Sequence, residues 1–396
     1  MTGGGGMPFG DFQNGIYLAG LGGAVPALPT SYAGLEAAAR DRLEPGPFGY
    51  VAGGAGEERT MAANRAAFDR WAIVPRHLRG VARGAAARDL SVDVLGTTLP
   101  APVLLAPIGV QSIIHPDAEV ASARAAASLG VPFVYSSAAS RTLEEVAAAM
   151  KDAPRWFQLY WPADPQLADS FLARAAAAGY GAVVVTLDTM ILGWRPRDLA
   201  SAYLPFLRGE GCALYFSDPV FRAALDRSPE EDRGAAIAHF LRVFSDPSLG
   251  WSDLDRLRTR TALPLVAKGI LHPDDARRAR DAGCDAVIVS NHGGRQIDGA
   301  VAALDALPDV VDAVGGDIPV LMDSGIRTGG DVLKALAMGA TAVLLGRPYA
   351  WGLALGGEEG VRFVVASLLA DLDLTLGLSG HQHAALVGPE LLARVR

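Results

Sequence analysis

Between residues 100 and 350, short apolar segments alternate with Ala-rich segments of helical pattern, and this alternation restricts the fold more than any other feature of the chain. Each apolar segment is rich in Val, Leu or Ile and has the length of a strand. Strands that alternate with helices predict βαβ units and a parallel sheet. The predicted strands are Val103–Ala106, Phe133–Tyr135, Trp156–Tyr160, Ala182–Leu187, Leu265–Ala267, Ala286–Val289, Val320–Met322 and Ala342–Leu345.

Predicted helices follow the strands, and several of them end where a glycine can form the C-terminal cap. Eight parallel strands with intervening helices is the number that closes an α/β (β/α)₈ TIM barrel, in which no sheet edge is left unpaired. Examples of the helices are residues 117–129, 143–150, 165–178, 273–282 and 330–338, and the capping glycines are Gly130, Gly179, Gly283 and Gly339.

We expect a single domain over residues 1–396, with the barrel at about 100–375. Residues 1–30 are rich in Gly and Pro and predict a loosely ordered N-terminal arm, and a helical segment follows at 32–42. The stretch between the fourth and fifth strands is longer than one helix requires. It predicts an insertion at about 190–250, placed at the catalytic end of the barrel and able to act as a lid.

Polar and charged side chains follow nearly every predicted strand. Turns require Gly, Asp or Asn, but they do not require Lys, His, Tyr or Arg. Active sites of barrels lie at the carboxyl ends of the strands, so these side chains predict one shared site. In strand order they are Gly109; Ser136 and Ser137; Gln158 and Tyr160; Thr186 and Asp188; Lys268; Ser290, His292 and Arg295; Asp323 to Arg327; and Gly346 with Arg347.

The last two strands end in Asp323-Ser324-Gly325-Ile326-Arg327 and Gly346-Arg347-Pro348. Glycines allow a ligand to approach the backbone, exposed amides donate to anions, and the two arginines add positive charge. Barrels often bind phosphate after strands seven and eight. These loops therefore predict a phosphate site, and the alternative is a pair of ordinary turns with surface arginines.

His292 follows the sixth strand, in Ser290-Asn291-His292-Gly293-Gly294-Arg295-Gln296. A neutral imidazole can accept a proton near pH 7, and an arginine can hold a carboxylate through two hydrogen bonds. Asp188, at the end of the fourth strand, could orient the imidazole and stabilise its charged form. The combination predicts proton abstraction from a substrate that carries a carboxylate.

Lys268 has three interpretations that its position leaves open. It could form a Schiff base, pair with a carboxylate, or place a positive charge beside a ring that becomes anionic. The first interpretation would make the protein a non-redox lyase or isomerase that binds a substrate phosphate. A catalytically silent scaffold is disfavoured because His292, Arg295, Arg195, Asp188 and Lys268 occur together.

Composition excludes several classes of function. With 35 basic and 43 acidic residues the formal charge is −8, and without a long basic run a nucleic-acid surface is not expected. Only Cys212 and Cys284 are present, which predicts neither a disulfide framework nor a metal site and suits a reducing cytoplasm. No signal peptide is visible, and the apolar runs are too short to span a membrane.

Four segments resemble the FMN-dependent 2-hydroxy-acid oxidase and dehydrogenase family, and the match extends from about Tyr32 to Gly380. They are Phe157-Gln158-Leu159-Tyr160, the His292 motif, Asp323 to Arg327, and Gly346-Arg347-Pro348. Further segments resemble the lactate 2-monooxygenase branch of that family: Ala106-Pro107-Ile108-Gly109-Val110, Leu187-Asp188-Thr189, Leu192 to Asp198, Asp218 to Phe221 and His272 to Ala276.

The resemblance implies FMN as cofactor, a 2-hydroxy acid as substrate and a role for each matched residue. His292 would take a proton while the α-hydrogen leaves to the flavin, with Asp188 paired to it. Arg195 and Arg295 would hold the carboxylate, and Tyr50 and Tyr160 would contact the carboxylate or hydroxyl. Cofactor contacts are implied for Pro107, Ile108, Gly109, Ser136, Gln158, Thr186, Lys268, Asp323, Ser324, Gly325, Arg327, Gly346 and Arg347.

Three residues depart from the pattern of many oxidases in the family. Ser324 and Gly109 match the monooxygenase branch instead, and Ala138 stands where glycolate oxidase has a bulky Trp. Oxygen, a cytochrome or a quinone could accept the electrons, and oxygen is favoured because no haem domain precedes the barrel and no membrane segment interrupts it. The resemblance implies L-lactate as first substrate, and decarboxylation of the retained keto acid to acetate, CO₂ and water. Its alternative is an oxidase that releases the keto acid and hydrogen peroxide, on a bulkier substrate if Ala138 widens the pocket. A homotetramer or homo-octamer is implied as well.

Overall fold

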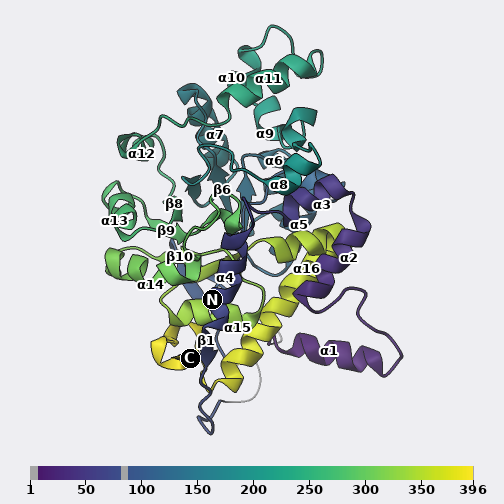
Figure 1. Ribbon diagram of the computed structural model, residues 1–396, viewed down its shortest axis with the longest axis vertical. Helices are drawn as coiled ribbons and strands as arrows, with labels where there is room; N and C mark the ends of the chain where they lie inside the picture. Colours follow the sequence, from purple (N-terminus) through teal and green to yellow (C-terminus); the bar gives the residue numbers. More distant parts are fainter. Residues whose placement is uncertain (1–7, 82–87, 396) are drawn as a thin grey trace.

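Residues 8–81 and 88–395 are described by the computed structural model, and among them eight parallel strands close into a barrel (Figure 1). The closed order is β10-β11-β4-β5-β6-β7-β8-β9. The predicted TIM barrel is confirmed. Its strands are β4 (Val103–Leu105), β5 (Phe133–Ser136), β6 (Arg155–Leu159), β7 (Val183–Thr186), β8 (Leu265–Ile270), β9 (Ala286–Val289), β10 (Val320–Met322) and β11 (Ala342–Leu345).

Alternate residues of each barrel strand point to opposite faces of the sheet. One apolar layer therefore fills the inside of the barrel, and a second lies between the strands and the outer helices. Leu104, Val184 and Leu344 belong to a cluster inside the barrel, whereas Val103, Val183 and Val343 pack against the outer helices. Those helices are α5 (Ala118–Ser128), α6 (Leu143–Met150), α7 (Pro165–Ala177), α12 (Trp251–Arg258), α13 (Pro273–Asp281), α14 (Ala303–Val314), α15 (Gly329–Ala337) and α16 (Arg347–Leu378). The four predicted capping glycines all have positive φ.

The fifth barrel strand differs from the prediction in a way that matters for the site. It extends beyond Ala267 to Ile270, and its pairing with β9 shifts register between Lys268 and Ile270. Gly269 lies at this irregularity with φ +104°. A side chain at Gly269 would collide with Asp188, whose Cβ is 2.8 Å from the position that a Cβ would occupy. Only glycine therefore combines this backbone with the neighbouring carboxylate.

The N-terminal segment is more ordered than its composition predicted. Residues Asp11–Gly20 form helix α1, where we expected a loose arm. The helix is held against α16, because Phe12 packs edge-on to Phe363 at 5.7 Å and the Gly10 amide donates to Asp373. Tertiary packing thus overrides a Gly-rich local sequence. Three helices follow, α2 (Tyr32–Arg42), α3 (Pro45–Ala52) and α4 (Arg59–Asp69), and α2 begins at the predicted residue.

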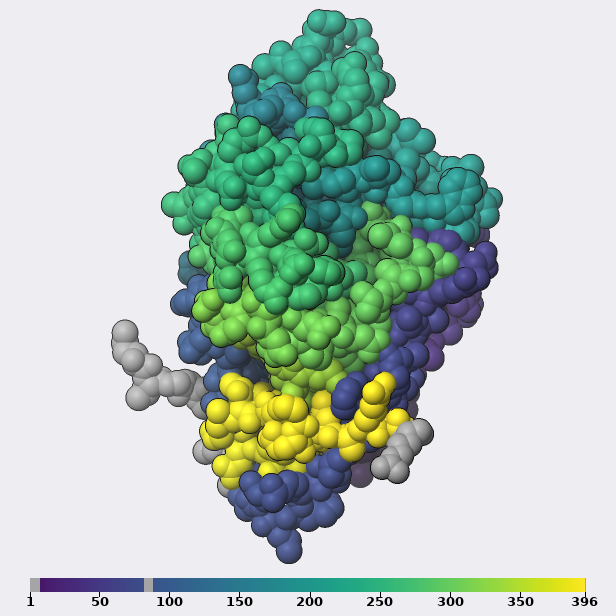
Figure 2. Space-filling model, turned by 60° about the vertical axis from the view of Figure 1, so that its left-hand side comes forward, coloured from purple at the N-terminus to yellow at the C-terminus, as the bar shows by residue number. Residues whose placement is uncertain are grey.

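Two small two-stranded sheets lie outside the barrel. Strand β1 (Trp71–Ile73) pairs antiparallel with β12 (Leu392–Arg394), and β2 (Val92–Val94) forms a hairpin with β3 (Thr97–Leu99). Figure 2 shows the C-terminal segment, in yellow, against the blue segment of the first quarter of the chain. This end of the molecule lies away from the insertion.

The insertion between β7 and β8 is a folded unit at the top of Figure 1. It contains α8 (Pro196–Ala200), the 3₁₀ turn η2 (Pro205–Arg208), α9 (Ala213–Phe216), α10 (Pro219–Ala223) and α11 (Arg233–Val243). Its helices share an aromatic core: Tyr215 packs edge-on against Phe240 at 4.8 Å, and Phe206 lies 5.5 Å from Phe244. No helix of the described residues combines the length and apolar character needed to cross a membrane.

Candidate active site

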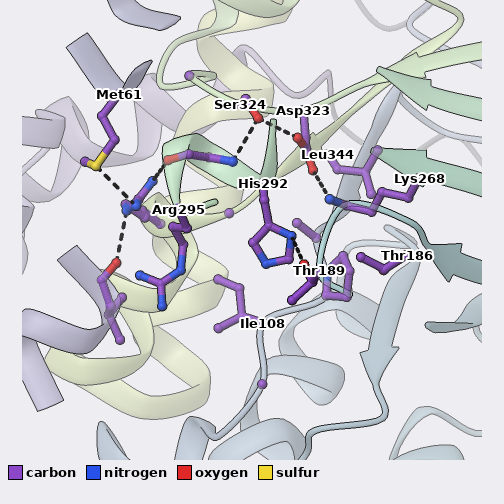
Figure 3. A pocket seen from close by; sticks show the side chains of 18 of the residues that line it. Met61, Ile108, Thr186, Thr189, Lys268, His292, Arg295, Asp323, Ser324 and Leu344 are labelled. Carbon is purple, nitrogen blue, oxygen red and sulfur yellow. Dashed lines mark hydrogen bonds and ion pairs between the residues drawn. The ribbon is translucent and has the colours of Figure 1, made fainter. Parts of the chain in front are cut away.

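One cavity at the carboxyl ends of the barrel strands collects most of the predicted site residues (Figure 3). The loops after the strands, the segment 32–65 and the insertion all contribute walls. From the predicted set it is lined by Tyr50, Pro107, Ile108, Gly109, Tyr160, Thr186, Arg195, Lys268, His292, Arg295, Asp323, Ser324, Gly325, Arg327, Gly346 and Arg347. The loops meet there because parallel strands of a closed barrel all end on one face.

His292 lines the cavity and is paired with Asp188, which does not line it. The Nδ1 atom of His292 lies 2.8 Å from Oδ1 of Asp188 and 3.1 Å from Oγ1 of Thr189. The second carboxylate oxygen of Asp188, Oδ2, is buried and has no hydrogen-bond partner among the described residues. His292 has φ +57°, and Gly293 and Gly294 follow it with positive φ as well. This uncommon backbone turns the imidazole of a non-glycine residue into the cavity.

The electrostatics of the pair keep the imidazole neutral and the carboxylate charged. Burial lowers the pKa of His292, and the charges of Lys268 and Arg195 act in the same direction against the opposing effect of Asp188. Burial alone would raise the pKa of Asp188, but His292 and Lys268 bring it down to about 2. A neutral imidazole whose Nδ1 is hydrogen-bonded to a carboxylate leaves Nε2 free to accept a proton.

Two arginines place unbalanced positive charge beside the imidazole. In Figure 3 the Arg295 guanidinium and the His292 ring lie side by side, and both are turned toward Ile108. Burial lowers the pKa of Arg295, and the neighbouring Arg195 lowers it further. Arg195 itself is held by the Arg295 carbonyl at 3.1 Å and by Gln296 at 2.8 Å. Such a pair favours an anionic ligand, and a carboxylate fits the planar geometry of a guanidinium.

Two tyrosines complete this end of the cavity. The hydroxyl of Tyr160 lies 3.5 Å from Nε2 of His292, and burial raises the pKa of Tyr160 so that it stays protonated. Arg295 is 5.0 Å above the centre of the Tyr50 ring and donates to the Tyr50 carbonyl. Both predicted tyrosines therefore lie where they can donate to an acid bound by the arginines.

Lys268 is a buried ammonium group, not a free amine. Its Nζ lies 3.0 Å from Oδ2 of Asp323 and donates to Ser290 at 2.9 Å. Burial alone would lower the pKa of Lys268, but Asp323 and Asp188 outweigh it and raise the pKa. Because a Schiff base requires an unprotonated amine, this setting disfavours covalent catalysis by Lys268. It favours the two interpretations in which the residue supplies a positive charge.

Ser136 and Gln158 lie behind the cavity wall. The Ser136 hydroxyl donates to Gln158 at 3.0 Å, and the Gln158 amide donates to Thr186 at 2.9 Å. Thr186 lines the cavity, whereas Ser136 and Gln158, both about 1% exposed, do not. Their side chains thus orient the Thr186 hydroxyl, and direct contact of the two residues with a cofactor stays a prediction.

The opposite end of the cavity carries the predicted phosphate loops. Gly346 is the N-cap of α16, and no atom lies within 4 Å of the position that a Cβ would occupy there. Ser324 and Gly325 both have positive φ. Open backbone at a helix N-terminus is a natural site for a phosphate group. The guanidinium of Arg327 lies 3.9 Å over the ring of Tyr32.

Arg347 has a role that the sequence did not predict. Its guanidinium donates to the carbonyl groups of Val51, Gly293 and Gly53, at 3.0, 2.9 and 2.9 Å. These bonds join the N-terminal helix α3 to the loop of His292. Arg347 also lines the cavity. Burial lowers its pKa, but a guanidinium still carries its charge at neutral pH, so Arg347 adds positive charge at the phosphate end.

Gly109 faces the loop after β5, and this packing requires glycine. A Cβ on Gly109 would lie 2.8 Å from the Ala138 carbonyl oxygen and 3.0 Å from the Ala138 Cβ. The neighbouring Val110 amide donates to that same carbonyl at 2.9 Å. The close approach of two loops therefore explains Gly109 without reference to the reaction product.

Several cavity residues were missed by sequence reasoning. They come from segments far from the barrel strands, so no strand-end pattern marks them. Thr189 and Leu192 are exceptions, since both belong to matched segments. The missed lining residues are Tyr32, Met61, Asn64, Arg65, Thr189, Leu192, Phe206 and Phe244.

The donor set fits a flavin mononucleotide. A phosphate would be held at the end formed by Gly325, Arg327 and Gly346, and a polar ring would lie near Thr186 and Lys268. The buried ammonium of Lys268 suits a ring that gains negative charge on reduction. His292 and Arg295 face the same space, so a substrate acid would lie against this ring.

Comparisons with known proteins agree with this geometry. The family profile described as FMN-dependent dehydrogenase matches residues 39–394. An FMN-dependent alpha-hydroxy acid dehydrogenase of Penicillium citrinum is 45% identical over 98% of this chain and 96% of its own length. An L-lactate oxidase of Lysinibacillus sphaericus is 43% identical over 89% and 90%. A crystal structure of mandelate oxidase superposes with a TM-score of 0.81 at 38% identity, and covers 93% of this chain and 98% of its own. The chain therefore belongs to the FMN-dependent dehydrogenase family and, like its relatives, uses FMN to oxidise a 2-hydroxy acid.

Proposed function

We propose that the substrate is a small 2-hydroxy acid, with L-lactate as the first candidate, and that O₂ is the electron acceptor. The observation that carries this proposal is the common cavity of a neutral His292 paired with Asp188 and the two arginines Arg195 and Arg295. The 43% identical L-lactate oxidase supports both the substrate and the acceptor.

The chain's own residues have distinct tasks in this reaction. Arg195 and Arg295 bind the carboxylate, and Tyr160 donates to the hydroxyl or carboxylate of the acid. Nε2 of His292 accepts the hydroxyl proton, and Asp188 stabilises the imidazolium that results. The chemistry that FMN would supply, when bound, is acceptance of the hydrogen and electron pair from the α-carbon, which would convert the acid to a 2-keto acid. Lys268 stabilises the negative charge that develops on the cofactor side.

For the product branch, we propose that the keto acid is retained and is oxidatively decarboxylated by the hydrogen peroxide formed from O₂, which gives the shorter acid, CO₂ and water. The alternative is release of the keto acid and hydrogen peroxide. The matched segments around Gly109, Asp188 and Arg195 support the first branch, and the folded insertion over the cavity can hinder release. Gly109 itself is a weak argument, since the Ala138 backbone already requires it. Quantifying acetate against pyruvate in the presence of catalase, which removes released peroxide before it oxidises pyruvate in solution, separates the branches.

A bulkier acid is the second candidate substrate. Ala138 is small and lines the cavity, and the apolar side chains of Leu192, Phe206 and Phe244 line it too. Such a wall can accommodate an aliphatic or aromatic side chain. The 38% identical mandelate oxidase structure supports this candidate.

The test is the visible spectrum of the purified protein before and after anaerobic addition of each acid. We expect flavin bands that bleach with L-lactate. Bands that bleach only with mandelate would establish the second candidate instead. Bands that persist with glycolate, lactate and mandelate would reject both substrates.

The compartment and the oligomeric state of the protein are part of the same proposal. Cys212 and Cys284 are both buried and unpaired, which supports a reducing, cytoplasmic compartment. We also propose a homotetramer or homo-octamer. Trp194 and Ile191 are each 73% exposed near the cavity, and apolar surface of this kind is often covered by a neighbouring subunit. Light scattering after size-exclusion chromatography measures the assembly directly.

A further inference from the structure

We propose that Glu210, in the insertion, is a positioning residue that determines which substrate side chains the enzyme prefers. It acts by holding Phe206 against the two loops that carry Gly109 and Ala138. The proposal rests on the proposed function, because it concerns the side-chain end of the same substrate site. It assigns a role to a residue that lies outside the cavity wall.

The turn that carries Glu210 has one well-defined shape. Gly209 and Gly211 flank the glutamate, and their φ angles of +72° and +74° lie in the left-handed region. Arg233, at the start of α11, donates to the carbonyl groups of Arg208 and Gly209 from the other side. The turn is therefore attached to the rest of the insertion, and Glu210 is left to face the barrel.

A chain of two hydrogen bonds links Glu210 to both loops of the barrel through Ser112. The Ser112 hydroxyl donates to Oε2 of Glu210 at 2.5 Å, and the Ser140 hydroxyl donates to the Ser112 hydroxyl at 2.8 Å. Ser112 follows the β4 loop and Ser140 follows the β5 loop. A backbone bond from Ala213 to Ala139, at 3.1 Å, attaches the same corner of the insertion a second time.

The two loops form a rigid base for this attachment. One buried oxygen of Glu119, in α5, accepts the amides of Gln111 at 3.1 Å and Ser140 at 3.0 Å. The Val110 amide donates to the Ala138 carbonyl. Because the base is cross-linked on its inner side, a change at Glu210 is expected to move the insertion and leave the loops in place.

Phe206 is the group that this arrangement positions. A Cβ on Gly211 would lie 3.0 Å from Cε1 of Phe206, 2.8 Å from the Ala138 carbonyl oxygen and 2.7 Å from Cγ2 of Val110. The Phe206 ring is thus packed close to the Ala138 backbone only because residue 211 has no side chain. The ring centre of Phe206 lies 5.5 Å from that of Phe244, and the ring centre of Phe244 lies 5.1 Å from that of Tyr160. A shift of the corner would displace the aromatic wall beside the catalytic residues.

The experiment compares acids that differ only in their side chain. Values of kcat/KM are measured for glycolate, which has none, and for the best acid of the spectral panel that bears one. The variants are Glu210→Ala, Glu210→Gln, Ser112→Ala, Phe206→Ala and the double variant Glu210→Ala/Phe206→Ala. Glu230→Ala is the matched control, because Glu230 is an exposed acid of the same insertion paired with Arg222.

We expect Glu210→Ala, Ser112→Ala and Phe206→Ala each to lower the preference for the acid with a side chain about tenfold, mainly through KM, as loss of an apolar contact does. The double variant should resemble Phe206→Ala alone, since both changes remove one wall. Glu210→Gln should retain the preference because its amide oxygen still accepts from Ser112. Glu230→Ala should leave it unchanged.

Equal losses for both acids, or effects of Glu210→Ala and Phe206→Ala that multiply in the double variant, would overturn the proposal. If Glu210→Ala does not fold, Ser112→Ala removes the same hydrogen bond from the barrel side and decides the question. Failure of the proposed function is recognised separately and earlier, because the flavin of the unmodified enzyme would then bleach with no acid of the panel.

Discussion

The cofactor end and the substrate end of the cavity are built from different parts of the chain. Thr186 and Lys268 lie in barrel strands, and Asp323 and Gly346 directly follow strands. At the substrate end, Tyr50 belongs to α3, and Arg195 and Phe206 belong to the insertion. The barrel contributes His292 and Arg295, on the loop after β9, and Tyr160, directly after β6, to the substrate end.

This difference indicates which residues have fixed positions and which can change to alter substrate preference. Strand ends of a closed barrel are fixed by the hydrogen-bonded sheet, so groups that hold a cofactor have little freedom. Segments packed on the barrel lie outside this hydrogen-bonded sheet, and changes there can alter substrate preference without disturbing the cofactor. The comparison predicts that substitutions at the two ends will affect different measurable quantities.

The largest effect is expected from His292→Gln, since the residue serves the chemistry itself. The rate of flavin reduction by the acid should fall about 10³- to 10⁴-fold, because no base remains to accept the hydroxyl proton. Affinity for FMN should stay within about twofold of the unmodified enzyme. Stopped-flow absorbance gives the rate, and fluorescence titration of the apoprotein gives the affinity. A large loss of FMN affinity would contradict the division between the two ends.

Asp188→Asn should lower the same rate by about 10²- to 10³-fold, because the imidazolium loses its stabilising carboxylate. Since Asp188 opposes the lowering of the His292 pKa, its removal should lower that pKa further. The acidic limb of the pH–rate profile, where His292 becomes protonated, should therefore move to lower pH. An acidic limb that moves to higher pH would show that Asp188 does not act through His292.

Glu119→Gln tests the contribution of a buried carboxyl group in helix α5 to the free energy of unfolding. Burial raises the pKa of Glu119 from 4.5 to about 7, so the folded protein binds this proton more tightly than the unfolded chain. The stabilising contribution is complete below pH 4.5 and is lost as pH rises through about 7, and a shift of this size corresponds to about 3 kcal/mol. Urea unfolding at several pH values should show that Glu119→Gln flattens this decline. An unchanged pH dependence would mean that Glu119 is not the group responsible.

Arg195→Met should raise KM for the acid by about 30-fold, since a charged hydrogen bond to the carboxylate is worth about 2 kcal/mol. FMN affinity should not change. Arg197→Met is a matched control, because this neighbouring arginine pairs with Glu58 at the surface. Steady-state kinetics with both variants checks the prediction. Equal effects of the two substitutions would assign the loss to the shape of α8 and not to the carboxylate.

The smallest effect is expected from Arg327→Met at the opposite end. Removing one charge near the phosphate loops should weaken FMN binding about tenfold and leave the preference among acids unchanged. Fluorescence titration measures the first quantity, and kinetics at saturating FMN measures the second. A changed substrate preference in the FMN-saturated variant would show that the two ends are coupled.

The sequence predicted most of the barrel strands and most of the site residues that follow them. The eight strands have the predicted cores, and His292, Lys268 and Asp323 share a cavity as their strand-end positions required. Prediction was weaker wherever a residue acts through another. Gln158 and Ser136 are close to the cofactor end by position, yet their side chains bond to each other and to Thr186. Arg347, expected to serve a phosphate, also bonds to three carbonyl groups of other segments.

What the sequence determined by itself was the periodic part of the protein: strand, helix, glycine cap and the reactive residue after each strand. These follow from local rules, since the period of apolar residues and the conformational range of glycine do not depend on distant parts of the chain. Only the tertiary structure decided that α1 is ordered on α16, that Gly269 makes room for Asp188 and that Glu210 attaches the insertion to Ser112. Each of these depends on two segments that approach within a few ångströms, and that proximity arises only when the whole chain packs.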